Sequence, residues 1–391
     1  MPDLNPVLFL LLPVAAVSGW YAATLSRRRS RDAGQSEFST EYFKGLNYLL
    51  NEQQDKAIEV FLRMAEVDRD TVETHFALGN LFRRRGEVDR AIRIHQNLIA
   101  RDTLTQEQRS QALLALAEDY MRAGLLDRAE DLFKEIIRRP GKHPKALGYL
   151  IDIYEQEKDW VSAIEATREL ANQTGENFDG VMAQYFCELA EQTVERGDHS
   201  AVIRYLERAL ATDPGCVRAN LIFGRLYEEQ GEYKKAIAVY KKVEAQDVEY
   251  VAEVIDGLLS CYARLGEPYE VMPYLSQLVD KSTGLSPMLA QASLIHRRDG
   301  NEAAEIYITE QLRRRPSVRG LDRLIEVHLA DSKEGFKENL MILRDLTQKL
   351  LEDKPVYECI RCGFKGRSLH WQCPGCKNWH TVKPVHGVEG E

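Results

Sequence analysis

The sequence has none of the short motifs that mark the common catalytic and nucleotide-binding sites. It contains no G-x-S-x-G nucleophile elbow, no phosphate-binding P-loop, no H-E-x-x-H zinc site and no G-x-G-x-x-G dinucleotide fingerprint. These absences disfavour the enzyme classes that depend on such motifs. We therefore expect a protein without catalytic activity of its own.

The chain also lacks an excess of positive charge. Its formal net charge at pH 7 is -9, whereas proteins that bind nucleic acids carry a basic face that neutralises phosphates. The basic runs Arg83–Arg85 and Arg313–Arg315 lie inside helical patterns, where a solvated helix face is the simpler interpretation. We expect no nucleic-acid partner.

Long apolar runs are absent except at the N-terminus. Val7–Leu25 contains nineteen residues and no charge, and at about 1.5 Å per residue it spans roughly 28 Å, close to the hydrocarbon core of a bilayer. SRRRSR follows at 26–31, whereas a cleaved signal peptide carries its basic residues before the apolar run. Because basic residues flank the cytoplasmic side of membrane helices, the pattern predicts a single-pass anchor at 1–26 and a basic linker at 27–37. The N-terminus would be periplasmic and the bulk of the chain cytoplasmic.

Residues 38–352 repeat with a period near 34. A small residue recurs at what we term the crossing position, and a glycine stands four or five residues ahead of most of these positions. In tetratricopeptide repeats two helices cross at a small residue and a glycine turns the chain between them. The sequence therefore predicts an all-α solenoid of about eight to nine helix pairs, closed by a degenerate pair near 319–352. The crossing positions are Ala57, Ala91, Ala129, Ala163, Val202, Ala236, Val271 and Ala304.

Stacked helix pairs form a groove that the first helix of each pair lines. Within that helix, the residues one and four positions after the register of Gly79 face the groove. Both signs of charge occur there, which favours binding of an extended peptide or another protein's surface, although a solvated surface residue is the simpler interpretation of any single one. The candidate partner-binding residues are Asn80, Arg83, Glu118, Met121, Asp152, Glu155, Arg225 and Glu228.

Cysteine is scarce, and four of the seven cysteines lie in one short tail. Cys359 and Cys362 form one C-x-x-C pair, and Cys373 and Cys376 form a second after ten intervening residues. A reducing cytoplasm disfavours disulfides, so two such pairs favour a tetrahedral four-thiolate site for one iron or zinc ion. We expect a small metal-binding module at 355–391. Because no position is left open for water, the metal would be structural or electron-carrying.

The tail carries more aromatic surface than so short a segment can bury. Such side chains pack against a neighbouring apolar surface. We therefore expect Tyr357, Phe364, Trp371 and Trp379 to hold the module against the last helices of the solenoid, near His328.

The remaining histidines and cysteines have simpler interpretations. His370 and His380 flank the second cysteine pair, but four thiolates complete the site, so we interpret both as surface imidazoles. Cys187, Cys216 and Cys261 stand alone in helical patterns and are interpreted as small residues of the core.

The order of these parts resembles one family of bacterial envelope proteins. The apolar LFLLLPVAAVSGWY, the repeats GNLFRRRGEVDRAIRIHQNLI and YMRAGLLDRAEDLF, and the tail CGFKGRSLHWQCPGCKNW are similar to the lipopolysaccharide assembly protein B family, essentially over the whole chain. The tail resembles rubredoxin in its two cysteine turns. Its interval between them is much shorter than in rubredoxins, which argues against free electron transfer.

The resemblance implies an adaptor of the bacterial inner membrane that regulates lipopolysaccharide synthesis. It implies that the chain brings the deacetylase that commits carbon to lipid A to an FtsH-type membrane protease, and that an inner-membrane regulatory partner restrains it. It also implies that Cys359, Cys362, Cys373 and Cys376 are the family's metal ligands. The alternative is an iron-dependent redox or redox-sensing protein that uses the four-cysteine tail.

Overall fold

The computed structural model describes residues 41–390 except 49, 52, 68–71, 282–283, 332–333, 353 and 389. The predicted anchor lies outside these residues. Within the described part of the chain, no helix is both long and apolar enough to cross a membrane. The chain forms two compact units, Met1–Ile153 and Tyr154–Glu391, which we describe in turn.

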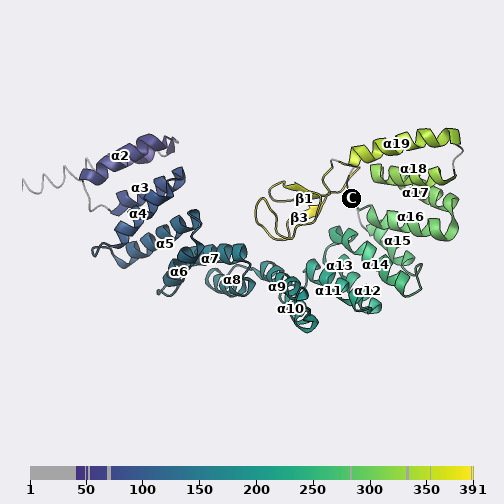
Figure 1. The fold of residues 1–391 in the computed structure, drawn as a ribbon, viewed down its shortest axis with the longest axis horizontal. Coiled ribbons are helices and arrows are strands. Elements are labelled where there is room, and N and C mark those ends of the chain that lie inside the picture. Colours follow the sequence, from purple (N-terminus) through teal and green to yellow (C-terminus); the bar gives the residue numbers. More distant parts are fainter. Residues whose placement is uncertain are drawn as a thin grey trace, which may run out of the picture. The chain divides into compact units, whose positions relative to one another are not determined.

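The first unit is a run of paired helices (Figure 1). Residues 41–48 are helical, and contacts join α2 to α3, α3 to α4, α4 to α5 and α5 to α6. The fully buried rings and alkyl groups of Phe61, Leu81 and Phe133 fill the spaces between neighbouring helices. The elements are α2 (Gln54–Val67), α3 (Val72–Arg85), α4 (Val88–Ile99), α5 (Gln106–Arg122), α6 (Leu126–Ile137) and most of α7 (Pro144–Glu157).

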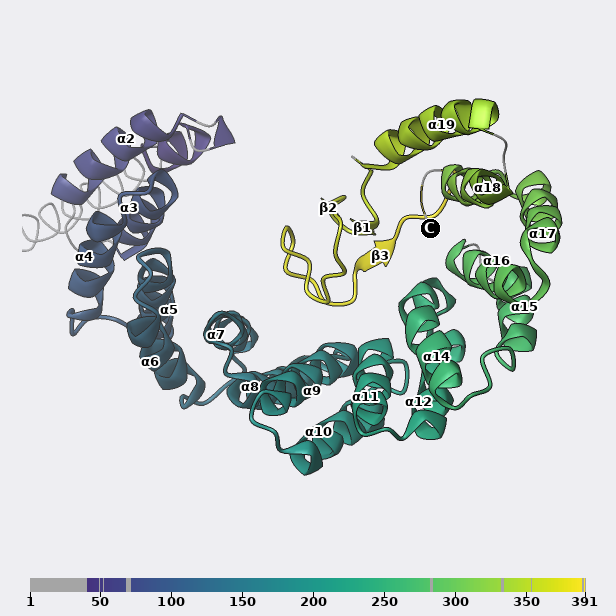
Figure 2. The same cartoon turned by 45° about the vertical axis from the view of Figure 1, so that its right-hand side comes forward.

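The second unit continues the pairs and ends in a small sheet (Figures 1 and 2). Its first elements are α8 (Trp160–Thr174), α9 (Asp179–Val194), α10 (His199–Thr212), α11 (Val217–Glu229), α12 (Tyr233–Tyr240), α13 (Lys242–Gln246), the 3-10 turn η1 (Val248–Tyr250) and α14 (Ala252–Arg264). Its last helices are α15 (Met272–Lys281), α16 (Ser286–Asp299), α17 (Asn301–Arg314), α18 (Val318–Asp331) and α19 (Glu334–Glu352).

The crossing positions confirm the predicted repeat. All eight of them, from Ala57 to Ala304, are 0 % exposed. A larger side chain at any of them would separate two helices whose remaining apolar residues are already in contact. The regular spacing of small residues therefore reports the fold directly.

The turns within the pairs follow one recurring geometry. Gly86, Gly124, Gly197, Gly231, Gly266 and Gly300 all have positive φ, between 73° and 90°. In the first of these turns the N–H of Glu87 donates to the carbonyl of Phe82 at 2.9 Å, which is the hydrogen bond of a Schellman helix end. Glycine adopts this backbone without strain, so these glycines end the first helices of their pairs, whereas Lys158, with a φ of 58°, takes this position after α7.

The tail forms a three-stranded antiparallel sheet in the order β2-β1-β3. The strands are β1 (Tyr357–Cys359), β2 (Lys365–Gly366) and β3 (Val382–Pro384). Cys359 pairs with the fully buried Val382 across β1 and β3. The sheet thus fixes one cysteine of the first pair beside the apolar interior of the module.

A glycine in α11 tests how tightly neighbouring helices approach. A Cβ atom at Gly224 would lie 2.0 Å from Cε1 of Tyr240, whose side chain is buried. We expect Gly224→Ala to lower the free energy of unfolding by about 1–3 kcal/mol because the ring has no room to move. Thermal unfolding followed by circular dichroism measures the change.

The matched control is Gly148→Ala in α7, where an added Cβ would meet nothing within 4 Å. That substitution should be neutral or stabilising by up to about 1 kcal/mol, because alanine favours the helix. Equal effects of the two substitutions would contradict the close approach of α11 and α12.

Candidate metal centre and binding groove

The four cysteines of the tail form one cluster. Their sulfur atoms all lie within 4.8 Å of one another. Cys359 Sγ is 3.8 Å from Cys376 Sγ, and Cys362 Sγ is 3.6 Å from Cys373 Sγ. A tetrahedral site with metal–sulfur bonds of about 2.3 Å has sulfur–sulfur edges of about 3.8 Å. The arrangement therefore fits one four-coordinate zinc or iron ion, held by these four residues.

Two turns of the same geometry bring the cysteines together. The N–H of Gly363 donates to the carbonyl of Cys359 at 2.9 Å, and the N–H of Lys377 donates to the carbonyl of Cys373 at 2.9 Å. Gly363 and Lys377 occupy equivalent positions and have φ of 74° and 58°. Each turn thus directs both of its sulfurs to one side, as the two C-x-x-C pairs predict.

The close spacing of the four sulfurs favours binding of a cation between them. Burial opposes ionisation of Cys359, but the Thr381 hydroxyl and backbone N–H groups lower its pKa to about 6. A backbone N–H from Phe364 favours the thiolate of Cys362, yet burial and the neighbouring cysteines raise its pKa to about 12. Four sulfurs this close therefore do not all ionise by themselves. A bound cation removes the repulsion and supplies the missing charge.

Close packing around the sulfurs explains a glycine that sequence reasoning missed. A Cβ at Gly375 would lie 3.3 Å from Cys362 Sγ. Gly375 stands between Cys373 and Cys376, so its hydrogen leaves space for the sulfur of the other turn. The one available signal was its place inside the second C-x-x-C pair.

A single carboxylate in α7 joins the module to the helices. Glu155 Oε1 accepts hydrogen bonds from Trp379 Nε1 at 2.8 Å and from the Tyr185 hydroxyl at 2.7 Å. Its other oxygen, Oε2, accepts one from Gln372 Nε2 at 2.8 Å. The Trp379 ring also packs edge-on against Trp160, with ring centroids 6.0 Å apart. Glu155, predicted to line an open groove, is instead covered by the module.

A second contact forms around Tyr250 at the end of η1. The ring of Tyr250 stacks on Trp371, with centroids 5.6 Å apart, and its buried hydroxyl donates to the carbonyl of Val382 at 2.9 Å. Lys383 lies over the same ring and pairs with Asp247. We call Glu155, Trp160, Tyr185, Arg218 and Tyr250 the docking face.

The docking face corrects the predicted position of the module. Trp371 and Trp379 pack on α7, α8, α9, α11 and η1, not on the last helices near His328. His328 lies on α18, where its ring is 3.5 Å from Glu305. The end of the tail reaches that helix through a hydrogen bond from the N–H of Val318 to the carbonyl of Val388 at 2.8 Å.

The other aromatic and histidine residues divide between the two sides of the module. The Tyr357 hydroxyl donates to Glu253 at 2.6 Å, so Tyr357 contacts the solenoid at α14 and not at the last helices as predicted. Phe364 instead packs beside the cysteines and against His370. His380 is not a free surface imidazole, because it stacks on Tyr250 with ring centroids 5.3 Å apart.

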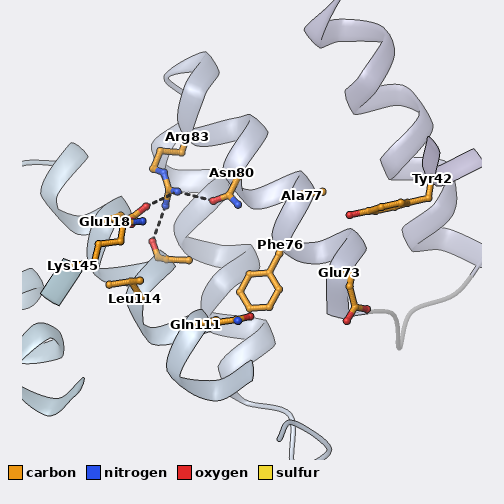
Figure 3. Close-up of a pocket in the computed structure, with 11 residues that line it drawn as sticks. Tyr42, Glu73, Phe76, Ala77, Asn80, Arg83, Gln111, Leu114, Glu118 and Lys145 are labelled. Atoms are coloured by element: carbon orange, nitrogen blue, oxygen red, sulfur yellow. Dashed lines mark hydrogen bonds and ion pairs between the residues drawn. The ribbon is translucent and has the colours of Figure 1, made fainter. Parts of the chain in front are cut away.

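The first unit contains a separate cavity of about 420 Å³ (Figure 3). Phe76 and Leu114 provide apolar surface, and Asn80, Arg83 and Glu118 bring three of the predicted groove residues together. Its lining residues are Tyr42, Glu73, Phe76, Ala77, Asn80, Arg83, Gln111, Leu114, Ala115, Glu118 and Lys145.

Ion pairs neutralise the basic side chains of this cavity. Arg83 lies 2.7 Å from Glu118 and 2.8 Å from the fully buried Asp119, and Lys145 lies 2.6 Å from Glu118. Asp119 lies behind the cavity wall and also pairs with His95. The cavity itself is lined by two carboxylates, Glu73 and Glu118, and two cations, Arg83 and Lys145. Arg83 therefore links α3 to α5.

The remaining predicted groove residues lie outside this cavity. Met121 is half-buried on α5, and Asp152 is exposed on α7. In the second unit Arg225 is exposed on α11, whereas Glu228 accepts hydrogen bonds from Ser260 at 2.5 Å and from Tyr240 at 3.3 Å. Glu228 thus supports the packing of neighbouring helices.

Comparison with known families identifies both parts of the described chain. Models of the tetratricopeptide repeat match residues 74–107, 114–177 and 194–256. A model described as a rubredoxin metal binding domain matches residues 357–384. These matches support an all-α repeat fold followed by a four-cysteine metal module.

Two relatives match this chain over almost its whole length. Lipopolysaccharide assembly protein B of Escherichia coli K12 is 42% identical over 385 residues, which cover 98% of this chain and 99% of the relative. The protein of the same name from Haemophilus influenzae is 34% identical over 392 residues, again 98% and 99% of the two chains. A solved tetratricopeptide repeat protein from Parabacteroides merdae covers 80% of this chain and 98% of its own at 13% identity, with a TM-score of 0.30.

Removing the charge of Glu155 tests the docking face. The Glu155 carboxylate accepts hydrogen bonds from three donors. Glu155→Gln replaces one of its oxygens by an N–H donor and leaves a single carbonyl oxygen to accept. Because hydrogen bonds to a charged group contribute roughly 1.5–3 kcal/mol each, we expect partial release of the module. Limited proteolysis of the full chain should then cut within 357–384 at least several-fold faster.

The exposed Glu229 on α11 provides the matched control, since Glu229→Gln changes the same charge away from the docking face. Its cleavage rate should equal that of the unchanged chain. Equal resistance of the Glu155→Gln chain would show that the carboxylate does not hold the module.

Proposed function

Because the chain belongs to the lipopolysaccharide assembly protein B family, we propose that it regulates lipopolysaccharide synthesis as a binding scaffold rather than as an enzyme. It binds the committed-step UDP-3-O-acyl-N-acetylglucosamine deacetylase and presents it to an FtsH-type membrane protease. An inner-membrane partner restrains this activity. The observation that carries the proposal is the open, partly apolar cavity on the first helices of unit 1.

The use of the equivalent surface in unit 2 supports this choice of site. By repeat register Glu155 corresponds to Arg83, and in unit 2 that position binds Trp379 of the chain's own tail. The module therefore occupies a surface on which other repeat proteins bind partners. In unit 1 the cavity around Phe76 and Leu114 is suited to a partner because an apolar wall there lies beside charged side chains.

The chemistry of the cavity defines the segment that it would accept. Phe76 and Leu114 suit one apolar side chain, and the exposed Glu73 carboxylate suits a lysine or arginine beside it. An extended segment of the client with an apolar residue next to a basic one would meet both requirements. The tightly paired Arg83 would shape the wall and make few direct contacts.

The predicted anchor at Val7–Leu25 would make a weak contact effective. Holding the chain in the inner membrane confines it to the surface where a membrane protease works. Effective concentration then rises without any new contact. The metal module, in this proposal, is structural, and its four thiolates leave no position for a substrate.

Photo-crosslinking in living cells tests the cavity as the client site. A photoreactive amino acid at Phe76 should crosslink to the deacetylase, because that side chain is half-buried in the wall of the cavity. The same amino acid at Leu125, exposed at the turn before α6, serves as the control. Crosslinks of equal yield from both positions, or none from Phe76, would remove the cavity from the proposal.

Metal exchange separates the scaffold from the alternative of an iron-dependent redox protein. A zinc-loaded chain cannot carry electrons at this site, yet it should keep full activity in controlling deacetylase turnover. The half-life of the deacetylase, measured in a reconstituted membrane system with matched zinc and iron forms, decides the point. Activity of the iron form alone would favour the redox function.

A further inference from the structure

Two of the three cysteines outside the metal module are in contact. Cys187 lies on α9 and Cys216 at the start of α11, and both are 0 % exposed. Their sulfurs are 3.7 Å apart, although 29 positions separate them in the sequence. Each stands alone in a helical pattern of the sequence, because only the stacking of α9 on α11 in the fold brings them together.

The groups around the pair favour an ionised sulfur. Cys216 is the N-cap residue of α11, and Gln184 Nε2 lies 3.7 Å from its sulfur. Burial raises the pKa of Cys187, whereas the hydrogen bond from Cys187 lowers the pKa of Cys216. The pair thus contains one sulfur suited to react first and a second placed to follow.

A buried arginine adds positive charge beside the pair. Arg218 is 3 % exposed, and its Nη2 donates to Glu188 and Glu191 at 2.8 and 2.7 Å. Its Nε and Nη1 have no hydrogen-bond partner among the described residues. Their charge stabilises a thiolate at either sulfur. A buried polar side chain with unused donors is an unusual neighbour for two inert core cysteines.

We propose that Cys187 and Cys216 form an oxidisable dithiol that closes to a disulfide between α9 and α11 in response to peroxide. The Cys216 thiolate attacks one peroxide oxygen and becomes a sulfenic acid. The other peroxide oxygen leaves as water after protonation. Cys187 then attacks the sulfenic sulfur, forms the S–S bond and releases a second water. Two thiols lose two electrons, which reduce one hydrogen peroxide to two waters.

The position of the pair connects this reaction to the metal module. Tyr185, two residues before Cys187, donates to Glu155 and packs against Trp379. Arg218, two residues after Cys216, lies over the ring of Trp371. A disulfide would fix the spacing of the two helices from which these side chains reach the module. The reaction is distinct from any chemistry of the four metal-binding cysteines.

Access is limited to small oxidants. Cys216 follows the turn of α10 into α11, where Pro214 is exposed and Gly215 is half-buried. Local opening of this turn would admit a molecule of the size of peroxide. A reducing dithiol would reverse the bond through the same opening.

The test uses the full-length, zinc-loaded protein exposed to graded hydrogen peroxide, then alkylated and digested with trypsin. We expect a disulfide between the peptides 169–196 and 209–218, which mass spectrometry distinguishes from all others. Cys261 is equally buried but isolated. Its peptide 243–264 should be recovered in the alkylated form at least tenfold more often than the peptides 169–196 and 209–218. Dithiothreitol should restore both alkylated peptides.

A variant confirms the order of the two sulfurs. In Cys187→Ser the reaction should stop at the sulfenic acid of Cys216, which dimedone traps on peptide 209–218. The disulfide is measured in the unaltered protein. That measurement therefore decides the proposal even if the Cys187→Ser variant does not fold. The proposal is overturned if both cysteines remain alkylated to the same extent as Cys261 at peroxide levels that oxidise free cysteine.

Discussion

The arrangement of the second unit depends on the hydrogen bonds that the Glu155 carboxylate accepts. This carboxylate accepts hydrogen bonds from Tyr185 of the helices and from Gln372 and Trp379 of the tail. A carboxylate removed from water is unfavourable unless its oxygens are satisfied, and here donors from both partners satisfy it together. Tail and helices therefore complete one polar site that neither forms alone. The stacking of Trp371 on Tyr250 adds apolar contact beside it.

The metal cluster presents the donors to that carboxylate. A segment as short as 357–384 buries too little apolar surface to fold by itself, and its core holds few fully buried side chains besides Cys359, Cys373 and Val382. A structural metal supplies on the order of 10 kcal/mol of folding free energy. The same turns that aim sulfurs at the ion place Trp371 and Trp379 on the outer side. Metal binding and docking thus both depend on the fold of the same short segment.

Much of this architecture could be predicted from the sequence because it depends on local rules. Small residues such as Ala91, turn glycines such as Gly86 and the two C-x-x-C pairs each satisfy a constraint within one or two turns of chain. The partner of Glu155 could not be predicted, because Trp379 is 224 positions away and a glutamate at a groove position has the same pattern whether a foreign peptide or the chain's own tail covers it. The contact of Cys187 with Cys216 was missed for a related reason, since it depends on stacking between repeats. The predicted anchor lies outside the described residues and remains a prediction.

The dependence of docking on the metal is measured most directly by amide hydrogen exchange of the full chain before and after complete removal of the metal by a chelator. We expect faster exchange throughout 357–384, together with reduced protection in α9 and α11, whose side chains form much of the docking face. Exchange in α3 to α5 of the first unit should not change. Unaltered exchange in 357–384 after metal removal would contradict the proposal that four thiolates and one ion hold the module in the form that docks.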